Sequence, residues 1–441
     1  MNKNHTIPLE LEGINRTIFE WAINSPLFNS IFGEDTGTEA LLVKILGKEA
    51  DQRELASLTL YQYIWTKYPE FGPNLLINLL PQFEHDRVFY DNYRDHTTHM
   101  IKCFLLGLYF YDSCLVFKEL INDPAIFVKT WALTALYHDI GYIFENDFVN
   151  PKEGYLIKIM DMINNTLFAP LSNIPLFSGD LSKTRERKII DKHRIYTGNI
   201  QGISEFEDEE LFDSLKEYGE LSNLSSAKKV NGIYKYYIYA NSKKTKDGRM
   251  GFRDHGISSA VIFIKLWNLY KEYVVEIYTN KNIIEEFGEE SKKKIEGLYL
   301  NISSDEGLIN KAVGAIALHN INKDLWDEDD ALISKLDLKK FHISFKHEKL
   351  FFAFLLRFCD EIQMWDRIRY RKPEKTDKNV YGADLDIYAT NDKIFITFDE
   401  DYKTYVNPEN VEGSLFRKLF DTLQKYLDSY EIKNLLFCKK K

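Results

Sequence analysis

Ten histidines occur in the chain, and five of them lie in or at the ends of apolar segments with helical periodicity. These five are His96, His99, His138, His255 and His319. An imidazole without a partner is costly to bury, and so is a carboxylate such as Asp139 or Asp360 in an apolar segment. Each of these side chains, taken singly, fits a hydrogen-bonded core residue or a helix cap. Taken together, imidazoles and carboxylates form a ligand set that suits Mn, Fe, Zn, Co or Mg.

Two of the spacings are specific enough to suggest chemistry. His138 and Asp139 follow the apolar segment AIFVKTWALTALY and precede Ile140-Gly141, where glycine can end a helix in the left-handed conformation. The last turn of that helix can therefore direct an imidazole and a carboxylate at one ion. His96 and His99 stand three positions apart and so share one face of a helix. One of them could bind a metal ion while the other donates a proton.

Composition limits the class of protein. The chain has 441 residues, is 44% hydrophobic and 28% charged, and carries a formal charge of −10. This is an ordinary globular composition, and the net negative charge argues against bulk nucleic-acid binding. The four cysteines form no CxxC pair, which suits a reducing cytoplasm. The first residues lack the apolar core of a signal peptide, and Lys102 and Asp112 interrupt the longest apolar run, so we expect no membrane span.

Helical periodicity runs through most of the first 145 residues, and it returns in segments between residues 255 and 368. The sequence therefore predicts a mainly α protein with a helical segment at 1–90 and a catalytic body at 91–372. An irregular insertion is expected at 150–251. Residues 373–441 read as a small α+β appendage, with two strands joined by Asn391-Asp392 and an amphipathic helix from about Gly413 to Tyr430.

The ordered set His99, His138-Asp139 and Asp360 resembles the HD superfamily of metal-dependent phosphohydrolases. The signature of that superfamily is a His, a His-Asp doublet and a distal Asp on separate helices. The added His255 and His319 are similar to the longer ligand set of HD-GYP and cyclic-nucleotide phosphodiesterases, which hold two metals. The resemblance covers roughly residues 90–145 and 250–370. It implies an HD-type helical bundle as the catalytic body.

The resemblance also implies roles for these residues. Asp139 and Asp360 would bridge or share one or two divalent ions, which are capped by His99, His138, His255 and His319. A metal-activated hydroxide would then attack a phosphoester or phosphoanhydride of a nucleotide. His96, near the position of the histidine acid in the phosphodiesterases, is expected to protonate the leaving oxygen.

Three arginines are candidates for binding the substrate. Arg94 and Arg253 precede His96 and His255 closely and could reach a phosphate, although surface or capping roles fit them equally well. Arg367 belongs to a basic cluster interleaved with aromatic residues. Such a cluster can stack a base and hold phosphates, or it can be the solvated end of a helix.

The chain departs from the HD-GYP sequence pattern at several positions. These departures limit the range of expected substrates and leave other functions open. Tyr142 replaces the lysine of HD-GYP proteins, and Asn320 follows His319 without a Gly-Tyr-Pro motif, which argues against cyclic di-GMP. One alternative function is that of a deoxynucleoside triphosphate triphosphohydrolase, which would use the metal ions in the same way. A di-iron oxygenase on an HD-type scaffold and a nucleotide-sensing module of a bacterial defence or regulatory assembly are further alternatives. The insertion and the appendage leave room for a protein partner or a homo-oligomer.

Overall fold

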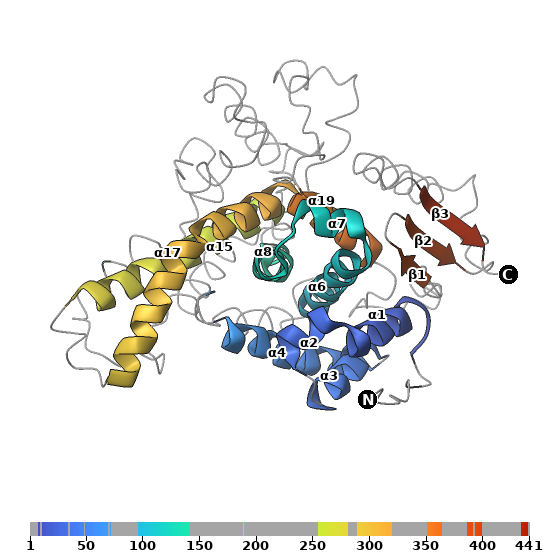
Figure 1. Cartoon of the computed structure of the whole chain (residues 1–441), viewed down its shortest axis with the longest axis horizontal. Helices are drawn as coiled ribbons and strands as arrows, with labels where there is room; N and C mark the ends of the chain where they lie inside the picture. The colour runs from blue at the N-terminus through green and yellow to red at the C-terminus, as the bar shows by residue number, and fades with distance from the viewer. Residues whose placement is uncertain are drawn as a thin grey trace, which may run out of the picture. The chain divides into compact units, whose positions relative to one another are not determined.

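The structure is a computed structural model, and the part of it described here is mainly α-helical (Figure 1). It describes residues 8, 11–33, 36–47, 49–68, 71, 96–141, 188, 255–280, 289–319, 351–363, 386–390, 393–398 and 434–439. The chain forms two compact units. The first contains Met1–Ile64, Glu84–Leu136 and His342–Lys441, and the second contains Trp65–Phe83 and Tyr137–Phe341. None of the described helices is long and apolar enough to cross a membrane.

The first unit begins with four helices, α1 (Gly13–Asn24), α2 (Pro26–Phe32), α3 (Thr36–Leu46) and α4 (Ala50–Lys67), the last of which continues into the second unit. Ser25 separates α1 from α2, and its hydroxyl accepts a hydrogen bond from the Phe28 amide at 3.2 Å, as an N-cap residue does. The same hydroxyl donates to Asp112 at 2.7 Å, and the Trp21 indole donates to that carboxylate at 3.0 Å. These bonds hold α1 and α2 against the helix that carries Asp112.

That helix, α6 (His96–Ser113), is the centre of the first unit. Its side chains are buried without interruption from His96 to Tyr111, and it contacts α1, α2, α7 (Leu115–Leu120) and α19 (Phe351–Ile362). A helix covered on every side needs mostly apolar residues all round, which explains the apolar sequence from Cys103 to Tyr111. Gly107 allows α8 (Pro124–Tyr137) to approach, because a Cβ there would lie 2.2 Å from the Trp131 ring. The Trp131 indole donates to the Phe104 carbonyl at 2.9 Å.

The two ends of α8 are both fixed by side chains. The Asp123 carboxylate accepts hydrogen bonds from the amides of Ala125 and Ile126, at 2.8 and 3.3 Å, and so caps the helix at its start. Near its end, the Tyr61 hydroxyl donates to the carbonyl of Leu136, one of the last carbonyls of the helix. The helix therefore ends at Tyr137, immediately before His138.

A three-stranded sheet completes the first unit, in the order β1 (Asp386–Ala389), β2 (Lys393–Phe398) and β3 (Asn434–Lys439). The predicted hairpin is confirmed, because β1 and β2 pair antiparallel with Ile387 opposite Ile396. The sequence did not predict β3, which pairs parallel to β2. The amide of Ala389 donates to the Tyr109 hydroxyl at 2.8 Å, which ties β1 to α6. The helix predicted at 413–430 lies outside the described residues.

In the second unit, α15 (His255–Thr279) and α17 (Glu289–Leu318) form a long pair (Figure 1). Two contacts show that the pair is antiparallel. Nζ of Lys271 lies 2.7 Å from Oε1 of Glu306. Tyr278, further along α15, stacks on Tyr299, earlier on α17, with ring centroids 4.2 Å apart. The start of α15 therefore lies beside the end of α17. The predicted insertion at 150–251 lies outside the described residues apart from Lys188, and the predicted domain boundaries stay a prediction.

Candidate metal centre

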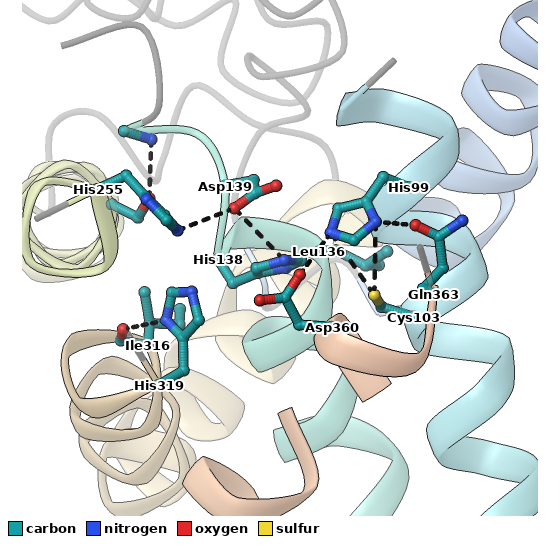
Figure 2. Close-up of polar contacts among 12 residues, drawn as sticks. His99, Cys103, Leu136, His138, Asp139, His255, Ile316, His319, Asp360 and Gln363 are labelled. Atoms are coloured by element: carbon teal, nitrogen blue, oxygen red, sulfur yellow. Dashed lines mark hydrogen bonds and ion pairs between the residues drawn. The ribbon is translucent and has the colours of Figure 1, made fainter. Parts of the chain in front are cut away.

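Four side chains that can bind metal gather within the second unit (Figure 2). His138 and Asp139 directly follow α8, His255 is the first residue of α15, and His319 follows the last residue of α17. We call these four residues the Asp139 cluster. Tyr137, the last residue of α8, stacks on Phe263 of α15 with ring centroids 4.4 Å apart. This contact brings the His-Asp doublet to the start of α15.

Asp139 lies at the centre of this cluster. Its Oδ1 is 3.5 Å from Nε2 of His138 and 3.4 Å from Nε2 of His255. The ring of His319 lies 5.2 Å, centroid to centroid, from the rings of both His138 and His255. Three imidazoles and one carboxylate thus lie close together.

These separations fit ligands that share an ion better than they fit direct hydrogen bonds. Hydrogen bonds between nitrogen and oxygen have lengths of about 2.7 to 3.2 Å, shorter than both Asp139 contacts. Two ligand atoms that each lie about 2.1 Å from one ion are roughly 3.0 Å apart at a right angle and roughly 3.4 Å apart at a tetrahedral angle. The 3.4 and 3.5 Å contacts of Asp139 correspond to the second case.

The protonation of His319 leaves one ring nitrogen suited to a metal. Its Nδ1 lies 2.6 Å from the carbonyl oxygen of Ile316, which can only accept, so Nδ1 carries the proton and donates it. Nε2 of the neutral ring then carries the lone pair. Histidines that bind metals usually have this arrangement, in which a backbone carbonyl orients the ring through its other nitrogen.

Two small residues of α15 allow the helices to meet around this cluster. Ser259 is fully buried, and its hydroxyl accepts a hydrogen bond from the Gly141 amide at 2.7 Å, which fixes the turn after the His-Asp doublet. A Cβ on Gly256 would lie 2.7 Å from the Ile316 carbonyl oxygen and 2.9 Å from two atoms of the His319 ring. Only glycine lets α15 pack this closely against His319.

Gly256→Ala is accordingly expected to destabilise the protein and displace His319. The added methyl overpacks the contact between α15 and α17, which typically costs about 1 to 3 kcal/mol. Gly307→Ala is the matched control, since a Cβ at that position of α17 has open space around it and alanine favours the helix. Urea unfolding of both variants measures the difference. Equal stabilities for the two would contradict the close approach at Gly256.

A second cluster lies within the first unit and contains His99, Cys103, Asp360 and Gln363, which we call the His99 cluster (Figure 2). His99 and Cys103 come from α6, Asp360 comes from α19, and Gln363 directly follows that helix. Nε2 of His99 lies 3.0 Å from Oδ1 of Asp360. The His99 side chain is fully buried, whereas the Asp360 side chain is 19% exposed.

Neither Cys103, which belongs to this cluster, nor Cys359, which stands next to Asp360 in the sequence, acts as a further ligand. Sγ of Cys103 is 3.8 Å from both ring nitrogens of His99. An atom equidistant from the two nitrogens does not lie along the lone pair of either, so this thiol packs against the ring. Burial, and secondarily the charge of Asp360, raise the pKa of the Cys359 thiol well above its usual value. Cys359 therefore remains a neutral thiol, which is a poor metal ligand.

The donors present fit a divalent metal ion. The ligand atoms of His138, Asp139 and His319 all lie within 4.8 Å of one another. Asp139 is 4% exposed, and a carboxylate at that depth requires positive charge or several hydrogen-bond donors close to it. An ion among three imidazoles would supply that charge. Imidazole and carboxylate donors suit Zn, Fe, Mn and Co.

The structure brings the residues predicted from the sequence together in two sets. His99 pairs with Asp360, and His138, Asp139, His255 and His319 form the other set. The shared centre of all six residues stays a prediction. His96 is the first residue of α6, one turn before His99, and is buried. Its role as an acid also stays a prediction. Arg94, Arg253 and Arg367 lie outside the described residues.

Sequence reasoning missed the residues that support the ligands. Gln363 follows Asp360 by three positions, a spacing that places two side chains near each other on a helix and that therefore could have identified it. Gly256 stands directly after His255, and a glycine inside the first turn of a long apolar helix is a sign of close packing. Comparisons of the whole chain with protein-family models, with curated proteins and with solved structures found no match.

Proposed function

We propose that this protein is a metal-dependent phosphohydrolase that acts on a phosphoester or phosphoanhydride of a nucleotide. The observation that supports it most is the surroundings of Asp139. Its Oδ1 lies 3.5 and 3.4 Å from two imidazole nitrogens, and a third histidine ring lies 5.2 Å from both of those rings. The reaction class follows from the resemblance of the ordered ligand set to HD phosphohydrolases.

The roles of the ligands follow from their positions. His138, Asp139, His255 and His319 would hold one divalent ion, and His99 and Asp360 would supply ligands of their own within the first unit. A bound divalent ion supplies a Lewis acid for the phosphoryl oxygens and a means of generating a nucleophile from water near neutral pH. Burial of the donors excludes bulk water, which strengthens their electrostatic effect on a phosphate.

Proton transfer to the leaving group is assigned to His96. This residue opens α6 and shares a helix face with His99, which pairs with Asp360. Histidine is the side chain most often used as a general acid, which is why the role is given to an imidazole at this position. Such general acid catalysis contributes about 10²- to 10⁴-fold to the rate.

A hydrolysis screen of the purified chain tests the proposal. The substrates are dNTPs, NTPs, cyclic nucleotides and dinucleotides, each with Mn²⁺, Mg²⁺ or Co²⁺. We expect turnover of at least one class, its loss with a chelator and its return with metal. Release of triphosphate from a dNTP would identify a triphosphohydrolase. Nucleotide binding without turnover would instead support a sensing module, and a folded, metal-loaded protein that neither binds nor hydrolyses any nucleotide would contradict the proposal.

The same donors favour one different function, that of a di-iron oxygenase. Two histidines and a carboxylate, as found around Asp139, are the set that binds iron in non-haem oxygenases. Metal content and the visible absorbance of the aerobically purified protein separate the two functions. Stoichiometric iron with a visible band that changes on reduction, together with no phosphate release, would favour the oxygenase.

A further inference from the structure

Gln363 is a buried amide in contact with a proposed metal ligand. It directly follows α19, and its side chain is almost completely enclosed, at 1% exposure. Its Oε1 forms a hydrogen bond with Nδ1 of His99. A buried amide needs such partners, because an unpaired polar group in the interior costs about 1 to 3 kcal/mol.

This bond determines which nitrogen of His99 carries the proton. The Oε1 atom of Gln363 can only accept, so Nδ1 of His99 donates and Nε2 of the neutral ring carries the lone pair. Nε2 is the nitrogen that lies 3.0 Å from Oδ1 of Asp360. Two lone pairs at that distance repel unless a cation, either a proton or a metal ion, lies between the two atoms. The separation fits a hydrogen bond, and it also fits the roughly 3.0 Å between two ligands bound at a right angle to one ion, so a metal ion would bind here in place of a proton.

The ring of His99 is also held sterically. Sγ of Cys103, one helical turn further along α6, is 3.8 Å from both ring nitrogens. The thiol limits the tilt of the ring, while the amide of Gln363 limits its rotation about the bond to Cβ. The amide is neutral, so it orients the imidazole without adding a negative charge beside the Asp360 carboxylate.

We infer that Gln363 is a positioning residue, which fixes the tautomer and orientation of His99 so that Nε2 and the Asp360 carboxylate bind one metal ion. The inference rests on the proposed function insofar as that function requires the metal. Partners of this kind behind a ligating histidine typically account for about 10- to 100-fold in metal affinity.

The first test is the tautomer of His99 in the metal-free protein, measured by long-range ¹H–¹⁵N NMR correlations with ¹⁵N-labelled histidine. The wild type should have the proton on Nδ1. Gln363→Leu, which removes the acceptor, should shift the ring toward the Nε2-protonated or a mixed form, and Gln363→Glu, which restores an acceptor, should return it. An unchanged tautomer in Gln363→Leu would overturn the inference, whether or not the protein binds metal.

The second test is metal affinity, measured by competition of Mn²⁺ or Zn²⁺ with a chelator. Gln363→Leu should bind about 10- to 100-fold more weakly, and Gln363→Glu should stay within a few-fold of the wild type. Tyr111→Phe is the matched control, because it removes a buried 2.6 Å hydrogen bond from another residue of α6. Gln363→Ala replaces the leucine variant if that variant does not fold. Wild-type affinity in the variants that lack the acceptor would overturn the inference, whereas failure of the wild type to bind metal would overturn the proposed function.

Discussion

Asp139→Ala is expected to lose bound metal and hydrolytic activity together while the helices remain folded. Asp139 supplies the only carboxylate of the Asp139 cluster, and its Oδ1 faces the Nε2 atoms of His138 and His255. Without it, three imidazoles remain as ligands and the negative charge that attracts the cation is gone. Metal content by mass spectrometry, kcat on the substrate found in the screen and far-ultraviolet circular dichroism measure the three effects.

The control for this variant is another buried carboxylate of the same unit. Asp305 on α17 is 8% exposed and does not belong to the Asp139 cluster. Asp305→Asn should retain metal and turnover even if it lowers the free energy of unfolding. Wild-type metal content and kcat in Asp139→Ala would refute the role of the doublet. Loss of metal from both variants would show that the assay reports only on stability.

His96→Ala should lower kcat by about 10² or more for a substrate with a poor leaving group, because general acid catalysis supplies at least that factor. The kcat of the same variant on a p-nitrophenyl ester should fall far less, since that leaving group needs little protonation. Metal content should remain near that of the wild type. Steady-state kinetics on the two substrates, with metal analysis of the same preparation, measure the difference.

The comparison between substrates gives this prediction its specificity. Equal losses on both substrates would eliminate His96 as the acid and leave it a structural residue of α6. Loss of metal would instead make His96 a ligand. Gly107→Ala serves as a control for damage to α6, because a Cβ at Gly107 would collide with the Trp131 ring. It should reduce stability without making kcat depend on the leaving group.

The mainly α fold could be predicted from the sequence, because periodic apolar residues dictate helices. The sequence also identified His99 and Asp360 as polar residues of apolar helices that need a partner, but not that they pair with each other. The hairpin at 386–398 was also predictable, because its residues alternate around an Asn-Asp turn.

Other features depend on packing and could not be read from the sequence. Strand β3 pairs parallel to β2 across a connection of many residues, and a short apolar segment such as Asn434–Lys439 does not specify its neighbour. The spacing from Asp360 could have marked Gln363 as a residue near the ligands, but its bond to His99 joins positions 264 apart, so only the tertiary structure identifies that partner. Ser259 is similar, since a serine in an apolar helix does not indicate that its hydroxyl holds the Gly141 amide.

The order of segments along the chain has a consequence for biosynthesis. The first unit takes its helices from both sides of the second unit in the sequence, so α6 leaves the ribosome long before α19. At roughly 5 to 20 residues per second, the 264 positions between His99 and Gln363 take roughly 10 to 50 seconds to translate. During that time α1 and α2 can already cover one side of α6, but the side that receives α19 stays exposed. The Asp139 cluster is complete once His319 has emerged, so the nascent chain acquires its two sets of ligands in succession.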